Sequence, residues 1–256
     1  MPATNIDEVI ATLTGIIDDA RAKASRLGYF AALYRRVTQS VKDGIASGRF
    51  QNGPLIERLD VTFANRYLDA VAQYQGGGQP TRSWAVAFQA THDPFPLIVQ
   101  QLLAGINAHI NLDLGVATAA VAPGDQLPGI RTDFDQINAV LASLVGTVEK
   151  EIAEVSPAIG LLEELGMRTD TTIINFDLTK ARDLAWFHAQ RLAVTPSNEI
   201  DAVIAEMDPA VAALGKLVAH PGPVIDAVLA PIRLVESDNI RRAIDVLASP
   251  AVAATA

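Results

Sequence analysis

Residues 96–120 read PLIVQQLLAGINAHINLDLGVATAA and form the most apolar long segment of the chain. At about 100° per residue of an α-helix, His109 and Asp113 fall on the same side as the large aliphatic residues of this segment. The opposite side carries polar residues: Gln100, Asn107, Asn111 and Thr118. The segment therefore predicts a core helix whose apolar stripe contains two ionisable groups one turn apart, and such groups need partners.

The same helical period recurs along the rest of the chain, without strand-like alternation, and stretches rich in Gly and Pro separate the periodic segments. We predict a single all-α, bundle-like domain of about eight to ten helices over residues 1–256, with a possible subdomain break near Met167 and a frayed tail at residues 249–256. Pro231 is expected to kink or split the last predicted helix, residues 224–247. The other long helices are predicted at residues 6–24, 29–47, 54–74, 131–155, 174–193 and 198–218.

Composition excludes several classes of function. The chain of 256 residues is 50% hydrophobic and only 5% aromatic, so Ala, Leu, Ile and Val must build its core. A net charge of -9 argues against binding to nucleic acid, which selects basic surfaces. The absence of Cys excludes disulfides and cysteine nucleophiles. No apolar run is long and uncharged enough to span a bilayer, and the first residues lack the basic charges of a signal peptide. We expect a cytoplasmic protein.

A second predicted helix also carries acidic residues on its apolar side. In the segment 54–74, Asp60 falls at the centre of the apolar stripe with Glu57 beside it, whereas Arg66 falls on the solvent-facing side of the helix. Together with the central pair, the two buried stripes hold three carboxylates and one imidazole but no Lys or Arg. Buried carboxylates without compensation are costly, so they must be protonated, paired or bound to a metal.

One interpretation of this pattern is a metal centre. His109 and Asp113, four residues apart, would join Glu57 or Asp60 from the neighbouring helix around a divalent metal, as in carboxylate-rich helical bundles. These ligands would suit Fe, Mn or Zn. The reaction would then be of the hydrolase, lyase or oxygenase type.

A second interpretation uses the same residues without a metal, in an enclosed pocket. Asp60 or Glu57, with its pKa raised by burial, would exchange a proton with His109, while Tyr34, Tyr67 or Asn138 orients the substrate. Such a site suits isomerisation, cyclisation or hydrolysis of an apolar small molecule.

Two further interpretations involve no catalysis. The protein could hold an apolar small molecule in its interior, with the polar cluster binding the head group of that molecule. Alternatively, the cluster could be a hydrogen-bonded network in a purely structural or interaction protein, which would expose an apolar helix face to a partner. The sequence does not decide among these functions, and it leaves the oligomeric state open.

Four segments of the chain resemble a known family. They are ERLDVTFANRYLDA (57–70), PTRSW (80–84), NAHINLDLGVA (107–117) and DFDQINAVLASL (133–144). They are similar to an actinobacterial family known only as domain of unknown function 5995, over roughly residues 27–193. The resemblance implies a shared all-helical fold and brings no activity, substrate or catalytic residue with it.

Overall fold

The computed structural model describes residues 1–157 and 178–249, and within these ranges it contains helices and no strand. The predicted all-α fold is confirmed. The described residues form eleven α-helices, one π-helix and one 3-10 helix. The α-helices outnumber the eight to ten that we expected, because the predicted central helix and the predicted last helix are each divided.

Most helices begin and end close to the predicted boundaries. The N-terminal helix is capped by the Asn5 side chain, which accepts the Glu8 backbone N–H, and the third helix is capped in the same way by Asn52. The elements are α1 (Ile6–Lys23), α2 (Gly28–Ala46), α3 (Gly53–Gln75), α4 (Arg82–His92), α5 (Ile98–Asn107), the π-helix η1 (Ala108–Leu114), α6 (Gly115–Val121), the 3-10 helix η2 (Gly124–Ile130), α7 (Arg131–Val155), α9 (Leu178–Ala193), α10 (Ile200–Ala219), α11 (Pro223–Val235) and α12 (Ile240–Ala248).

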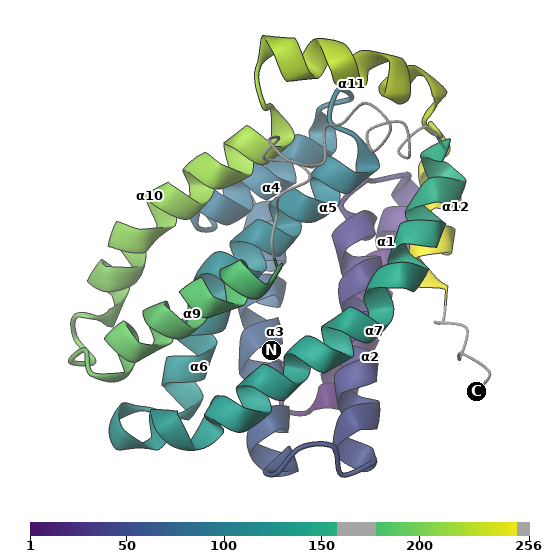
Figure 1. Ribbon diagram of the computed structural model, residues 1–256. Coiled ribbons are helices and arrows are strands. Elements are labelled where there is room, and N and C mark those ends of the chain that lie inside the picture. The colour runs from purple at the N-terminus through teal and green to yellow at the C-terminus, as the bar shows by residue number, and fades with distance from the viewer. Residues whose placement is uncertain (158–177, 250–256) are drawn as a thin grey trace.

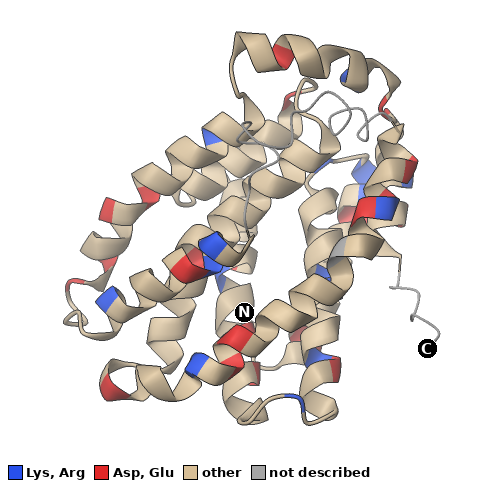
Figure 2. Cartoon of the chain, in the orientation of Figure 1, with Lys and Arg blue, Asp and Glu red and all other residues tan. Residues whose placement is uncertain are grey.

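The segment α5, η1 and α6 runs through the middle of the molecule (Figure 1). α9 and α10 pack against it on one side, and α2 and α3 pack against it on another. At the C-terminal end, α12 returns to the start of the chain and packs against α1, α2 and α7. Within the central segment, η1 holds the one Asp, Asp113, whereas α5 and α6 contain no Lys, Arg, Asp or Glu and show neither blue nor red in Figure 2.

The polar side of the central segment is buried, although we expected the apolar stripe alone to face the core. Gln100, Asn107, Asn111 and Thr118 are all buried. The Gln100 side-chain amide donates to the Val218 carbonyl at 2.9 Å, and that of Asn107 donates to the Val211 carbonyl at 2.8 Å. Both acceptors belong to α10, so amide groups that the sequence pattern assigned to a polar face instead join two core helices.

The predicted central helix is interrupted by the π-helix η1, from Ala108 to Leu114. A π-helix closes its hydrogen bonds from residue i to i+5, so each turn is wider than an α-helical turn. All seven residues of η1 are buried, among them His109 and Asp113. Such insertions are frequent at functional sites, and this one contains both ionisable residues of the central segment.

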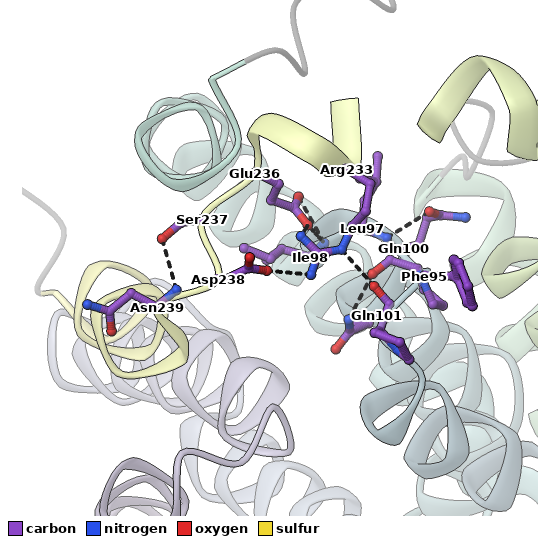
Figure 3. A network of polar contacts seen from close by, with 12 residues as sticks. Phe95, Leu97, Ile98, Gln100, Gln101, Arg233, Glu236, Ser237, Asp238 and Asn239 are labelled. Atoms are coloured by element: carbon purple, nitrogen blue, oxygen red, sulfur yellow. Dashed lines mark hydrogen bonds and ion pairs between the residues drawn. The ribbon is translucent and has the colours of Figure 1, made fainter. Parts of the chain in front are cut away.

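The predicted last helix is divided into α11 and α12, but the division is not at Pro231. Pro231 lies inside α11, which ends where Glu236 takes an extended backbone conformation. Figure 3 shows why this position matters: both carboxylate oxygens of Glu236 accept the Ile98 backbone N–H, at 3.1 Å each, at the start of α5. The connection between α11 and α12 therefore fixes the N-terminus of the central segment.

Some predictions fall outside the described residues. These are the subdomain break near Met167, the first part of the helix predicted at residues 174–193 and nearly all of the tail at 249–256. Among the helices that the structure describes, none has the length and apolar character needed to cross a membrane.

Candidate functional site

A cavity of about 220 Å³ lies between α2, α3, the central segment, α7 and α9. Its walls are mostly aliphatic, and the side chains that line it include Leu33, Val37, Val41, Ile56, Leu141 and Leu144. Three polar residues that the sequence analysis singled out also line it: Tyr34, Asp60 and His109. The structure therefore brings together part of the predicted catalytic set at one apolar cavity.

Asp60 is a buried carboxyl group on the inner side of α3. Its side chain lines the cavity, and its Oδ2 atom makes no hydrogen bond to another described residue. Burial, and to a smaller extent the nearby charge of Glu57, raises the pKa of Asp60 to about 7. Near neutral pH this carboxyl group can therefore donate a proton or accept one.

His109 is enclosed by aromatic rings. Its imidazole stacks on Phe63, with ring centroids 3.5 Å apart and planes 8° apart, and the ring of Tyr34 meets it edge-on at 4.4 Å. Neither imidazole nitrogen has a hydrogen-bond partner among the described residues. Burial lowers the pKa of His109, and the neighbouring Asp113 opposes this effect only in part. At neutral pH the ring is therefore uncharged, with one nitrogen as donor and the other as acceptor.

Asp113 lies behind His109 and is not a lining residue of the cavity. Its carboxylate accepts Arg66 Nε–H at 2.6 Å and Trp84 Nε1–H at 2.7 Å, and its Oδ2 atom lies 3.7 Å from His109 Nδ1. Burial alone would raise the pKa of Asp113, but Arg66, His109 and Trp84 together hold that pKa below its usual value. Asp113 is thus a fixed carboxylate whose negative charge favours the His109 tautomer with a proton on Nδ1.

The partners of Asp113 correct the sequence analysis. The sequence pattern places Arg66 on the solvent-facing side of its helix and offers no basic residue to pair with the buried acids. In the structure the Arg66 side chain reaches inward and is only 26% exposed. A long Arg side chain can lie at the edge of a buried stripe and still deliver its head group to the interior. Trp84 was also missed as a polar residue. The signal available was its indole N–H, which requires an acceptor when the ring is buried.

The two predicted tyrosines differ in position. Tyr34 lines the cavity, and its hydroxyl group has no hydrogen-bond partner among the described residues. Burial and the charges of Asp60 and Asp113 raise the pKa of Tyr34, so this hydroxyl keeps its proton. Tyr67 does not line the cavity; its ring lies behind, 6.2 Å from that of His109.

The four residues predicted as metal ligands do not form one ligand group. Glu57 is only half-buried and accepts the Ile6 backbone N–H at 3.4 Å, which corrects its placement on the buried stripe. Asp113 already pairs with Arg66. Within residues 1–157 and 178–249, no group of three or more His, Asp or Glu side chains is arranged to hold a metal ion. The described contacts thus give no support to a metal centre at His109, Asp113, Glu57 and Asp60, which stays a prediction from the sequence.

Two charged residues that line the cavity escaped the sequence analysis: Glu149 of α7, which is exposed, and Arg182. Arg182 of α9 is 3% exposed and contributes to the same cavity as Asp60 and His109. The available signal was its position next to Ala181 and one turn before Ala185, on the buried face of its helix. A basic residue on such a face needs a partner in the same way as a carboxylate does.

Comparison with known proteins gives a family and no activity. The sequence pattern of a family of unknown function, DUF5995, matches residues 6–221. No curated protein and no solved structure matches the chain significantly.

Proposed function

The chain belongs to the family of unknown function DUF5995, and we propose that it binds an apolar small molecule in the cavity described above. Asp60, His109 and Tyr34 then form hydrogen bonds to the polar end of that molecule. The observation that carries the proposal is that all three side chains line an apolar cavity with polar atoms that lack partners among the described residues. A buried polar atom without a partner costs free energy, which a bound molecule with a matching polar group would recover.

The size of the cavity supports this proposal. An engineered apolar cavity of about 150 Å³ binds benzene. The cavity of about 220 Å³ in this protein is larger, so it can accept a ring compound with substituents or a short aliphatic chain. Its aliphatic walls favour such molecules over hydrophilic metabolites.

Binding can be tested with three alcohols of different shape: octan-1-ol, p-cresol and geraniol. We expect at least one to bind the wild-type protein in a calorimetric titration. Asp60→Leu and His109→Phe should each weaken binding about 2- to 10-fold, the value of one hydrogen bond. His109→Phe keeps a ring to stack on Phe63. Leu141→Trp should abolish binding because the indole fills the cavity.

Asp69→Asn is the matched control, because Asp69 lies on the exposed face of α3 and does not line the cavity. It should bind the alcohols as the wild type does. Failure of all three alcohols to bind, or binding that Leu141→Trp leaves unchanged, would contradict the proposal.

A second candidate function is proton transfer on the bound molecule. The observation that favours it is the arrangement of Asp113 behind His109: a fixed carboxylate near Nδ1 leaves Nε2 as a proton acceptor, while Asp60 can supply a proton. In an apolar ketone, His109 Nε2 would take a proton from the carbon next to the carbonyl group, and Asp60 would protonate the carbonyl oxygen. Reversal of both steps restores the enzyme.

This reaction can be followed as exchange of the α-protons of octan-2-one for deuterium in D₂O by NMR. Exchange faster than in buffer, lost in His109→Phe and Asp60→Leu and retained in Asp69→Asn, would support proton transfer. If the wild type binds the alcohols but exchange proceeds at the buffer rate, the protein binds its ligand without this chemistry.

A further inference from the structure

Arg182 places a buried positive charge at the cavity, in the part formed by α9. One terminal guanidinium nitrogen donates to the Phe134 carbonyl oxygen, and the group lies over the Phe134 ring, with Cζ 4.3 Å from the ring centroid. Its Nε atom is buried and has no hydrogen-bond partner among the described residues. The guanidinium group thus keeps one donor that no described acceptor uses.

The charge of Arg182 persists at neutral pH. Burial lowers the pKa of Arg182, and the charge of Asp135 opposes this effect, so that the pKa lies at about 10. Within the described residues, no carboxylate lies at ion-pair distance from Arg182, and Asp135 itself pairs with Arg131 at 2.7 Å. Arg182 is therefore a buried cation whose charge is not matched by a contacting anion in the described part of the chain.

Two other arginines that point inward each have a carboxylate partner, which Arg182 lacks among the described residues. Arg36 of α2 is 5% exposed and pairs with Glu151, and Arg66 of α3 pairs with Asp113. Both therefore have the carboxylate that a buried guanidinium requires. Arg182 differs from them in lacking a described carboxylate partner and in lining the large apolar cavity.

We infer that the cavity ligand is an amphipathic carboxylate, an apolar chain ending in a negatively charged carboxyl group that pairs with Arg182. This inference rests on the proposed function and adds the chemical class of the ligand. Ile137, Leu141, Leu144 and Val148 of α7 supply the aliphatic wall for the chain. A charged hydrogen bond to a buried guanidinium is stronger than a neutral one, so the carboxylate binds more tightly than the alcohol of equal length.

The test compares octanoate with octan-1-ol at pH 7.5, where octanoate is ionised, by calorimetric titration. We expect the wild type to bind octanoate about tenfold or more tightly than octan-1-ol. Arg182→Met keeps much of the side-chain length, and it should remove this preference. Arg182→Lys keeps the positive charge and should retain part of it, and Leu141→Trp should abolish binding of both probes.

Arg131→Gln is the matched control, because Arg131 is close enough to influence the pKa of Arg182 but does not line the cavity. Its preference for octanoate should equal that of the wild type. If octan-1-ol binds to the wild type and octanoate binds no more tightly, the inference is overturned while the proposed cavity function stands. If neither probe binds, the inference is overturned, and the proposed cavity function is overturned with it only when p-cresol and geraniol fail to bind as well. The wild-type comparison decides the matter even if Arg182→Met does not fold.

Discussion

At the scale of single residues, Asp60 makes stability depend on pH. Its pKa rises from 3.8 to about 7 on folding, so the folded protein binds this proton more tightly than the unfolded chain does. The contribution of Asp60 to the free energy of unfolding therefore falls as pH rises through that window, by on the order of 4 kcal/mol, and levels off above it.

Asp60→Asn removes this titration. The difference in unfolding free energy between Asp60→Asn and the wild type should grow in favour of the variant from pH 4 to 7 and then level off. Urea unfolding at pH 4.5, 6 and 8.5 measures it. Asp69→Asn, on the exposed face of the same helix, controls for the substitution itself. If the difference in unfolding free energy between Asp60→Asn and the wild type does not vary with pH, the pKa of Asp60 is not raised on folding.

Asp113 and Arg66 form an ion pair whose carboxylate is fully buried. Removing one partner of a buried ion pair leaves the other without compensation, so Asp113→Asn should lower the free energy of unfolding by about 3 kcal/mol. The double variant with Arg66→Met should lose clearly less than the sum of the two single variants. We expect a coupling free energy of about 1–3 kcal/mol from denaturant unfolding.

The ion pair Arg131–Asp135 is exposed to solvent, with 2.7 Å between Nε and Oδ2, and provides the double-mutant cycle for comparison. Its coupling should be about 0.5 kcal/mol or less, because solvent screens both groups. Equal coupling in the two cycles would mean that burial does not strengthen the Asp113 pair.

At the scale of elements, Gly115 sets the distance between the central segment and α9. A Cβ atom at this position would lie 2.7 Å from the Ala185 carbonyl oxygen and 2.8 Å from His188 Cβ. Since a backbone carbonyl cannot move away cheaply, Gly115→Ala should destabilise the protein by about 1–3 kcal/mol in denaturant unfolding.

Gly15 of α1 is the matched control, because nothing lies within 4 Å of the corresponding Cβ position. Gly15→Ala should be neutral or stabilise the protein by up to about 1 kcal/mol, the usual advantage of Ala over Gly inside a helix. If both variants were stabilising, α9 would not pack as closely as described.

The helices could be predicted from the sequence, but their connections could not. The period of 3.6 residues places α1, α2 and α3 within a few residues of their observed bounds, because each buries a continuous stripe. By contrast, Asp208 accepts the backbone N–H groups of Arg82 and Ser83 at the start of α4, 125 residues or more away in sequence. Periodicity contains no information about such long-range caps.

At the scale of the whole molecule, the candidate site was only partly predictable. The apolar stripes correctly indicated that Asp60 and His109 are buried, because their helical neighbours are apolar. The role of Arg66 could not be predicted, because a flexible side chain at the edge of a stripe can point either way. The contribution of Arg182 depends on how α9 packs onto the central segment, which no local pattern specifies.

The cavity between α2, α3, α7 and α9 also affects the volume of the molecule. Unfolding eliminates internal void space, so an unfilled cavity makes the folded protein larger than the unfolded chain with its hydration water. Hydrostatic pressure favours the smaller state, and typical volume changes on unfolding are about -20 to -100 mL/mol. Any part of this cavity of about 220 Å³ that water does not enter therefore makes the fold sensitive to compression, and a molecule that occupied the cavity would make it less so.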